Sequence, residues 1–399
     1  MRPLETIGAL TAFERRGPGT DAERRAARWL AGELIAQRHR VRIETFWCRP
    51  NWAMAHAWHV ALALAASLLS PSSPTLGAIL LAFALAAILM DELTGVSPGR
   101  RLTPERASQN VVARTTTGAH DGRTPLIVTA NYDAGRTGLI YRDVLRRPSA
   151  YLRQVAGPLA LGWLAWLAIA IIWLLAVAVI RATAHHSSTA LGAIQLPPTV
   201  ALVLGLALLL EAAAAPYGPA ANDNATGSAV AIALQRAITA GRLESLELEL
   251  VLAGAGEGGD IGIRRHLRAR RRELRRAKAI VIGIAACGSP QPHYWSSDGR
   301  LIPLRYARPL RELAAGSQTA GPHRARGETP AFLARARGLA AIALGSVDER
   351  GLAPRSHQPQ DVEPTIDEAA LDQTLEFALE LIDAIDASLT PAQRSATPA

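Results

Sequence analysis

The stretch Ala221-Asn222-Asp223-Asn224-Ala225-Thr226-Gly227 runs directly into the apolar helical pattern of residues 228–240. Asp and Asn are favourable at a helix N-terminus, where the helix dipole stabilises a negative charge. We therefore interpret the stretch as a loop that places the Asp223 carboxylate at the start of a helix, with Gly227 allowing close backbone approach. An acid held in this way either caps the helix or ligates a metal ion, and the stretch alone does not decide between them.

The rest of the chain alternates between strand-like and helix-like patterns. Predicted helices cover residues 20–38, 228–240, 261–277, 330–337 and 366–388, and predicted strands cover 41–46, 110–114, 126–130, 246–253, 279–285 and 340–344. Residues 286 to about 328 read as mostly irregular. The alternation predicts an α/β fold with a central, mostly parallel mixed sheet that carries helices on both faces.

Four uncharged apolar blocks interrupt this pattern, at residues 52–70, 74–90, 156–180 and 199–210. The first three blocks are long enough to cross the roughly 30 Å hydrocarbon core of a bilayer, and residues 199–210 belong to a fourth predicted span. We predict four transmembrane helices, as one hairpin over 52–90 and a second over 156–214. The α/β domain is then discontinuous, comprising 1–50, 92–150 and 215–390, and the Pro/Ser/Thr-rich tail 391–399 is predicted to be disordered.

Charge suggests an orientation for the predicted spans. The formal net charge is +9, which favours an anionic partner such as a membrane surface. Arg181 is the only charged residue in the two predicted turns that connect the spans, whereas many arginines flank the spans on the other side. The positive-inside rule therefore predicts a multi-pass membrane protein with a cytoplasmic α/β domain. Two cysteines, Cys48 and Cys287, make no disulfide framework.

The densest charge lies in the basic run 264–278. No aromatic residues interleave with it and no nucleic-acid motif surrounds it, so we do not expect a nucleic-acid partner. The sequence leaves two interpretations of this run: the solvated outer face of a helix, or a helix that contacts anionic lipid headgroups. His56 and His59 lie three residues apart near the start of the first span, where a functional role competes with simple placement at the interface.

Two further loops follow or adjoin predicted strands, and a third comes just before the last predicted helix. They contain Asn131-Tyr132-Asp133, Glu257 within Gly254-Ala255-Gly256-Glu257-Gly258-Gly259, and His357 within Ser356-His357-Gln358-Pro359-Gln360-Asp361. Together with Asp223, their order resembles the zinc exopeptidase family of the bacterial double-zinc aminopeptidases and the glutaminyl cyclases. The resemblance covers residues 20–50, 105–135 and 215–388, with the predicted spans as insertions.

The resemblance implies a role for each matching position. Asp223, Glu257 and His357 match the ligands of one metal ion, Asp133 matches the carboxylate that orients the site, and Asp361 matches the neighbour of the last ligand. The glycines at 259 and 262 decide the register of the Glu257 loop.

The chain departs from the family pattern at three positions. The general-base position is Gly256, a histidine ligand is replaced by Asn131, and a strand-ending Asp falls at Ala285. Asp260 is the nearest spare acid, but we place it one turn into the 261–277 helix, a poor position from which to act.

An Asp/Glu/His set suits one tetrahedral zinc with an open position. The resemblance therefore implies a membrane-anchored metallopeptidase-like protein of aminopeptidase type, with at most one zinc ion and peptide hydrolysis weak or lost. Whether it is an enzyme stays open at this point. The alternatives are a relic site without metal, and a non-catalytic scaffold that uses the peptidase fold to bind a peptide or protein partner.

Overall fold

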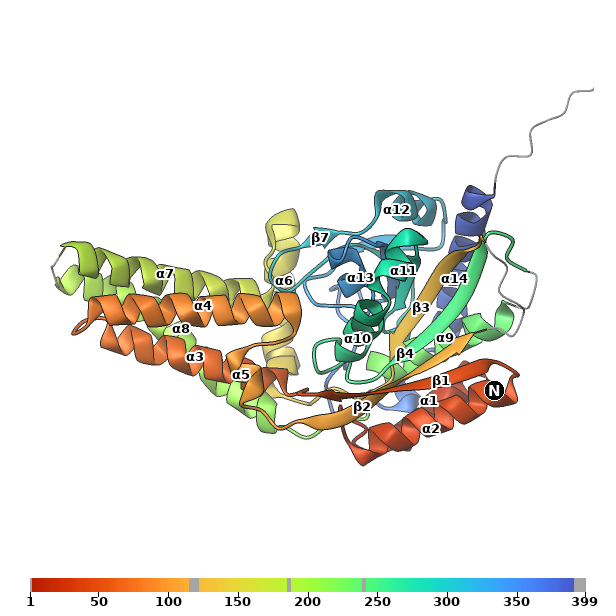
Figure 1. Ribbon diagram of the computed structural model, residues 1–399, viewed down its shortest axis with the longest axis horizontal. Helices are drawn as coiled ribbons and strands as arrows, with labels where there is room; N and C mark the ends of the chain where they lie inside the picture. The colour runs from red at the N-terminus through yellow and green to blue at the C-terminus, as the bar shows by residue number, and fades with distance from the viewer. Residues whose placement is uncertain (1, 115–121, 185–187, 239–241, 391–399) are drawn as a thin grey trace, which may run out of the picture.

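The computed structural model describes residues 2–114, 122–184, 188–238 and 242–390. Within these ranges, a nine-stranded sheet is covered by helices, and a bundle of four long helices projects from one end of it (Figure 1). The predicted tail 391–399, residues 239–240 of the helix after Asp223, and residues 185–187 between the last two spans lie outside the described residues.

The sheet is mixed, with a parallel centre. Its strands are β1 (Arg40–Cys48), β2 (Arg106–Arg114), β3 (Thr124–Asn131), β4 (Leu246–Ala253), β5 (Ile280–Ile284), β6 (Pro292–Asp298), β7 (Leu304–Arg305), β8 (Gly321–Arg324) and β9 (Ala340–Ser346). The order is β1-β2-β4-β3-β5-β9-β6-β7, with β8 beside β6. Strands β4, β3, β5 and β9 form a parallel centre, and β8 pairs parallel with β6, while β1, β2 and β7 pair antiparallel and β6 pairs antiparallel with β9. The sheet is therefore mixed, as expected, but its parallel part is smaller than the expected majority.

Helices cover both faces of the sheet, as expected. One face carries α1 (Pro3–Thr11), α2 (Asp21–Ala36), α9 (Thr226–Ala237), α12 (Arg308–Ala315) and α14 (Glu368–Leu389), and the other carries α10 (Ile261–Ala269), α11 (Arg271–Arg276) and α13 (Phe332–Ala336). Successive strand residues point to opposite faces. Accordingly, Val128 packs in the core with Phe377, whereas Ile127 packs in the other core with Phe332.

Two parts of the α/β domain differ from the sequence prediction. Residues 286–328 contain β6, β7, α12 and β8 rather than irregular chain. Two of these strands are very short or contain Gly and Pro, so they show no alternating apolar signal. The predicted helix 261–277 is divided at Arg270 into α10 and α11. The basic run stays mostly exposed, but Arg264 is buried and donates to the Leu93 carbonyl oxygen over 3.1 Å.

The bundle consists of α3 (Trp52–Leu69), α4 (Pro74–Thr94), α7 (Trp163–Ala184) and α8 (Thr189–Ala214), each long and apolar enough to cross a membrane. The third of these helices begins at Trp163 rather than residue 156. The fourth begins at Thr189 rather than 199, because Pro197 and Pro198 lie inside the helix. Prolines are tolerated where neighbouring helices supply replacement contacts. Small residues such as Ala63 and Ala84 line the bundle core and permit close packing.

A polar cluster closes the far end of the bundle. Arg181, predicted to lie in a connecting turn, belongs to α7 and is buried. It donates to Ser70 Oγ over 2.9 Å and to Gln195, whose Nε2 donates to Ser67 O over 2.6 Å. Arg181 is thus hydrogen-bonded inside the bundle through Nη1, while its buried Nε has no partner among the described residues.

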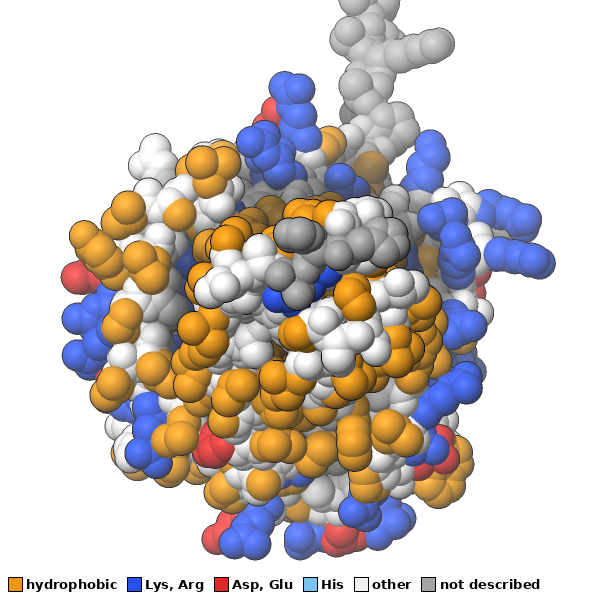
Figure 2. All heavy atoms as spheres, turned by 90° about the vertical axis from the view of Figure 1, so that its left-hand side faces the viewer, with side chains coloured by type: hydrophobic (Ala, Val, Ile, Leu, Met, Phe, Trp, Pro, Cys, Tyr) orange, Lys and Arg blue, Asp and Glu red, His pale blue; other side chains and the backbone are white. Residues whose placement is uncertain are grey.

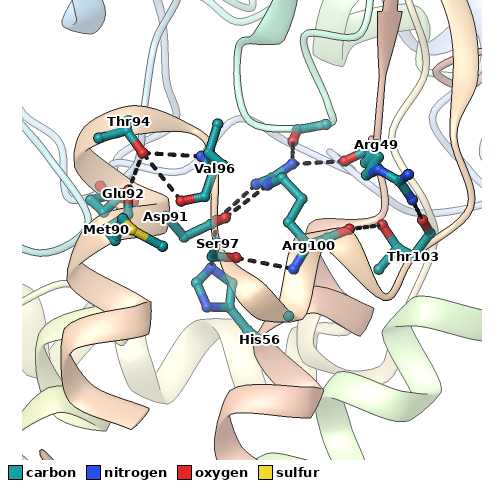
Figure 3. Close-up of polar contacts among 12 residues, drawn as sticks. Arg49, His56, Met90, Asp91, Glu92, Thr94, Val96, Ser97, Arg100 and Thr103 are labelled. Carbon is teal, nitrogen blue, oxygen red and sulfur yellow. Dashed lines mark hydrogen bonds and ion pairs between the residues drawn. The ribbon is translucent and has the colours of Figure 1, made fainter. Parts of the chain in front are cut away.

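At the near end, a buried ion pair joins the bundle to the α/β domain (Figure 3). Arg100, in the short helix α5 (Pro98–Arg101), donates to both carboxylate oxygens of Asp91 over 2.8 and 2.9 Å. Its third nitrogen donates to the Arg49 and Gly258 carbonyl oxygens, each over 2.9 Å. His56 Nε2 lies 3.7 Å from Asp91 Oδ2, which indicates a structural role for this histidine.

Replacing Asp91 by asparagine is expected to destabilise the protein strongly. The Asp91 and Arg100 side chains are 3% and 7% exposed, and removing one partner of a buried pair costs about 3–5 kcal/mol because the other charge stays buried. Asp143→Asn is the control, since its pair with Arg147 is more than half exposed and such pairs contribute about 0–1 kcal/mol. Thermal unfolding in detergent compares them, and equal midpoints for the two variants would contradict the prediction.

His266 gives a second, pH-dependent prediction. It lies between Glu44 of β1 and Glu249 of β4, with Nδ1 3.0 Å from Glu44 Oε2 and Nε2 3.1 Å from Glu249 Oε1. Burial lowers the pKa of His266, but both carboxylates outweigh it and the pKa is raised. Burial raises the pKa of both glutamates, but the interaction with His266 outweighs burial and lowers each pKa to about 2.

The contribution of His266 to the free energy of unfolding is therefore fully present below the usual histidine pKa of about 6.5. It is lost as the pH rises through the raised pKa of His266 in the folded protein. The glutamate contributions are present above about pH 4.5 and fade toward pH 2. We expect His266→Gln to cost most stability between about pH 4.5 and 6.5 and progressively less above it. Unfolding midpoints across this pH range test the prediction, which a cost that increases toward alkaline pH would contradict.

Candidate metal site

The three predicted ligands come from three separate connections at one edge of the sheet. Asp223 lies in a single π-helical turn, Ala221–Ala225, that continues into α9. Glu257 follows β4, and His357 lies between β9 and α14. The carboxyl ends of parallel strands meet at the same edge, where open α/β sheets commonly bind ligands.

Asp361, not Asp223, satisfies the start of this helix. Its Oδ1 accepts from the Asn222 backbone N–H over 2.7 Å and its Oδ2 from the Asp223 N–H over 3.1 Å. The capping interpretation of Asp223 is therefore wrong: Ala225 is the N-cap residue of α9 and no side chain caps it, while Asp223 Oδ1 accepts from Ser356 Oγ instead. Burial and the charge of Asp223 raise the pKa of Asp361 to about 7.

The structure brings the three predicted ligands together. Ligand atoms of Asp223, Glu257 and His357 all lie within 4.8 Å of one another. His357 Nε2 is 3.4 Å from Asp223 Oδ2 and 3.5 Å from Glu257 Oε2. Two tetrahedral ligands, each about 2.0–2.2 Å from a zinc ion, lie about 3.3–3.6 Å apart. The observed spacings match the edges of such a tetrahedron.

The His357 ring is held with Nε2 toward the acids. Its Nδ1 is 3.1 Å from the Arg136 carbonyl oxygen, and a proton on Nδ1 leaves the Nε2 lone pair free for a ligand. Tyr141 stacks on the ring with centroids 4.1 Å apart. A Cβ at Gly135 would lie 2.2 Å from His357 Cε1, so only glycine fits there. His357 itself has a φ of +59°, a strained backbone of the kind that collects at functional sites.

The carboxylates are oriented as well. Asn224 Nδ2 donates to Glu257 Oε1 and to the Asp133 carbonyl oxygen, each over 2.7 Å. Ser356 Oγ donates to Asp223 Oδ1 over 2.8 Å. The buried Asp223 Oδ2 accepts no hydrogen bond from any described residue. A buried oxygen without a donor beside a free imidazole nitrogen fits a cation between them.

The pKa shifts of Glu257 and His357 also fit a cation at this site. Burial raises the pKa of Glu257, and the charge of Asp223 raises it further. Burial lowers the pKa of His357, but the two carboxylates outweigh it and the pKa is raised. Without a cation the cluster therefore retains protons, which a bound metal ion would displace.

Asp133 acts on the Glu257 loop. It is fully buried, and its carboxylate accepts from the Gly256 and Glu257 backbone N–H groups over 3.0 and 2.9 Å. Burial, with the charges of Glu23 and Glu257, raises its pKa well above the ordinary value. This geometry is compatible with the orienting role that the resemblance implies, and the role itself stays a prediction.

Asn131 occupies the space next to the missing base. A Cβ at Gly256 would lie 2.2 Å from Asn131 Cγ. Asn131 Nδ2 donates to Asp260 Oδ1 over 3.1 Å. Asp260 is the N-cap residue of α10, with a φ of +51°, rather than one turn into the helix. Our expected placement was wrong because the loop turns back at this residue, which buries its side chain against Asn131.

Ala285 follows the end of β5 and supplies no carboxylate. Its carbonyl oxygen would lie 2.6 Å from a Cβ at Gly227. The close backbone approach predicted at Gly227 is thus present, and it places α9 directly against the strand end.

A buried arginine underlies the site and was not recognised from the sequence. Arg16 is 1% exposed. It donates to the carbonyl oxygens of Tyr132, Leu10, Pro219 and Ala220 over 2.6 to 3.1 Å. It therefore ties the N-terminal segment to the Asp133 and Asp223 connections. An isolated arginine in a weakly patterned segment gives no signal for such a role.

Comparison with known proteins agrees with this geometry. Residues 184–382 match Peptidase family M28, a range that includes Asp223, Glu257 and His357. No curated protein sequence matches the chain.

Solved structures share the fold over nearly the whole chain. BSAP, a zinc aminopeptidase from Bacillus subtilis, is 11% identical, with a TM-score of 0.56 over 97% of this chain and 95% of its own. An aminopeptidase from Aneurinibacillus sp. strain AM-1 is 14% identical, with a TM-score of 0.54 over 95% and 92%. Glutaminyl cyclase from Porphyromonas gingivalis is 13% identical, with a TM-score of 0.50 over 96% of both chains. The resemblance to the zinc exopeptidase family of the double-zinc aminopeptidases and the glutaminyl cyclases, with Peptidase family M28 as the matching family, is therefore confirmed.

Proposed function

We propose that this chain is a membrane-anchored, zinc-exopeptidase-like protein that holds at most one zinc ion and acts on peptide N-termini. Asp223, Glu257 and His357 would hold the ion. The observation that carries the proposal is the convergence of these side chains, with His357 Nε2 3.4 and 3.5 Å from two carboxylate oxygens. Asp223 Oδ2 adds support, since it is buried and accepts no hydrogen bond from the described residues.

The chemistry available at the site is limited by its protein groups. A zinc ion supplies Lewis acidity toward a peptide carbonyl. Asn224 and Asp133 hold the Glu257 loop in place. Gly256 offers no carboxylate to accept a proton, and a positioned base contributes about 10²–10⁴-fold to a rate. We therefore propose slow hydrolysis.

A second candidate function is a non-catalytic scaffold that binds a peptide or protein partner. The observation that favours it is Asn131, whose side chain fills the space that a base at position 256 would need.

The four apolar helices support the membrane anchoring, and the distribution of arginines at their two ends supports an orientation. Arginines flank the near end of the bundle, while Arg181 at the far end is buried. This asymmetry supports a cytoplasmic α/β domain. A reporter that is active only outside the cytoplasm, fused after residue 399, should stay dark; a signal would overturn this orientation.

Cleavage of fluorogenic aminoacyl peptides by the purified protein in detergent separates the two functions. We expect slow release that requires a free N-terminus and stops in chelator. A zinc-loaded protein without any release would favour the scaffold. A metal-free protein whose thermal midpoint is unchanged by zinc or chelator would overturn the zinc assignment.

A further inference from the structure

The helix α6 (Asp143–Ala156) was not predicted from the sequence, and it presents its apolar face outward. Its apolar residues recur at intervals of three, four and seven, as on one side of a helix. They are highly exposed: Val144 is 81% exposed, Tyr151 66%, Leu152 65% and Val155 69%. Leu159, just beyond the helix, is 83% exposed. A helix on a water-facing surface has the opposite arrangement.

The polar side of α6 faces the protein. Arg146 donates to the carbonyl oxygens of Ala353 and Ser356 over 2.8 and 3.3 Å. Gln154 Nε2 donates to the Glu349 carbonyl oxygen over 3.1 Å. Polar contacts therefore fix the helix to the α/β domain, and its apolar face remains uncovered.

The position of α6 indicates what covers that face. Only residues 157–162 separate it from α7, and it runs across the end of the bundle instead of along it (Figure 1). Figure 2, which looks along the bundle, shows hydrophobic side chains on the bundle and also on the surface beside it. If the bundle spans a bilayer, this surface lies at the level of the headgroups.

We propose that α6 is an in-plane membrane helix whose apolar face inserts into the bilayer surface. Val144, Tyr151, Leu152 and Val155 would lie among the upper acyl chains. Arg147, at the edge of this face, would reach the headgroup phosphates. The proposal rests on the membrane anchoring proposed above and extends it from four spans to the surface of the α/β domain.

The helix also forms a wall of the candidate metal site. Gln358 Nε2 donates to the Tyr141 carbonyl oxygen over 2.7 Å and lies 3.2 Å from Asp143 Oδ1. Tyr141 stacks on His357, and Arg146 holds the carbonyl oxygen of Ser356. The apolar face of α6 and the His357 loop are thus linked through α6 and the turn Leu139–Tyr141 that precedes it, so this side of the site would lie near the bilayer. Peptides held at the membrane surface are the substrate class that such a site would receive.

Depth-dependent fluorescence quenching in lipid vesicles tests the proposal. A fluorophore is attached to Leu152→Cys or Val155→Cys of the full chain, because the native Cys48 and Cys287 are buried. Leu204→Cys on α8, 61% exposed, serves as the control within a span. Ile35→Cys on α2, 59% exposed, is the control on the far part of the α/β domain.

We expect lipids brominated near the headgroup to remove more than about half of the emission at positions 152 and 155, with little effect at 35. Lipids brominated deeper in the chain should act mainly at 204. Quenching at 204 with none at 152 or 155 would overturn the α6 proposal and leave the spans in place. No quenching at any of these positions would overturn both the anchoring and the α6 proposal. The zinc site is measured independently and is unaffected by either outcome.

Discussion

Replacing His357 by alanine is expected to abolish stoichiometric zinc binding. The imidazole is the only nitrogen ligand among the three proposed ligands, and its Nε2 faces both carboxylates. Loss of an outer-shell partner already costs about 10–100-fold in metal affinity, so loss of the ligand itself should exceed about 100-fold. Zinc titration with a competing chelator, followed by metal analysis of the purified protein, measures the change.

His293→Ala is the matched control. His293 is also half-buried, but it lies on β6 and contacts the Gln291 carbonyl oxygen, away from the three ligands. We expect this variant to bind zinc like the unaltered protein. Equal zinc affinity in the two histidine variants would contradict the assignment of His357.

Introducing a glutamate at position 256 is expected to destabilise the protein unless Asn131 is shortened as well. The new Cβ would lie 2.2 Å from Asn131 Cγ, and overpacking of this kind costs about 1–3 kcal/mol. In the double variant Asn131→Ala/Gly256→Glu, the space is free, so most of that loss should be recovered. Because the two positions are in contact, their effects on the free energy of unfolding should be strongly non-additive.

The double variant should also hydrolyse aminoacyl peptides faster than the unaltered chain. A positioned base contributes about 10²–10⁴-fold, so we expect a gain within that range for zinc-loaded protein. Asn131→Ala alone should give no such gain. Gly32→Glu is the control for the substitution itself, because a Cβ at Gly32 meets nothing within 4 Å.

A double variant that folds and binds zinc, yet is as slow as the unaltered chain, would contradict our explanation. The missing base would then not be what limits hydrolysis.

The convergence of the three proposed ligands could be predicted from the resemblance, which matches Asp223, Glu257 and His357 to the ligands of one metal ion. Glu257 follows β4 and Asp223 lies in the turn that leads into α9, positions that meet at one edge of a parallel sheet, whereas His357 lies in the long connection between β9 and α14. Asp133 and Asp361 were matched by the resemblance, but most of the contacts that orient the ligands could not be predicted. Asp361 accepts from the Asp223 backbone N–H, and Tyr141 stacks on His357, through contacts between segments far apart in the sequence.

The helix α6 shows a different limit of sequence analysis. Periodicity identifies a helix by assuming that its apolar face is buried in the protein. In α6 the polar face packs on the protein through Arg146 and Gln154, and Pro148 lies inside the helix. Periodicity analysis assumes that the polar face of a helix points into water and that prolines end helices, so both features prevented the prediction of α6.

The predicted start of the fourth helix of the bundle was wrong for a different reason. We began the fourth predicted span after the double proline, but Pro197 and Pro198 lie inside α8. Helices packed against one another can accommodate a local loss of backbone hydrogen bonds.

The strands β7 and β8 were missed because two and four residues are too few to show alternation.

X-ray absorption at the zinc edge, on purified full-length protein loaded with one equivalent of zinc, tests the central assignment most directly. We predict one imidazole nitrogen and carboxylate oxygens about 2.0–2.2 Å from the ion, without scattering from a second zinc. Bound zinc without an imidazole ligand, zinc with sulfur ligands, or a protein that retains no zinc would contradict it.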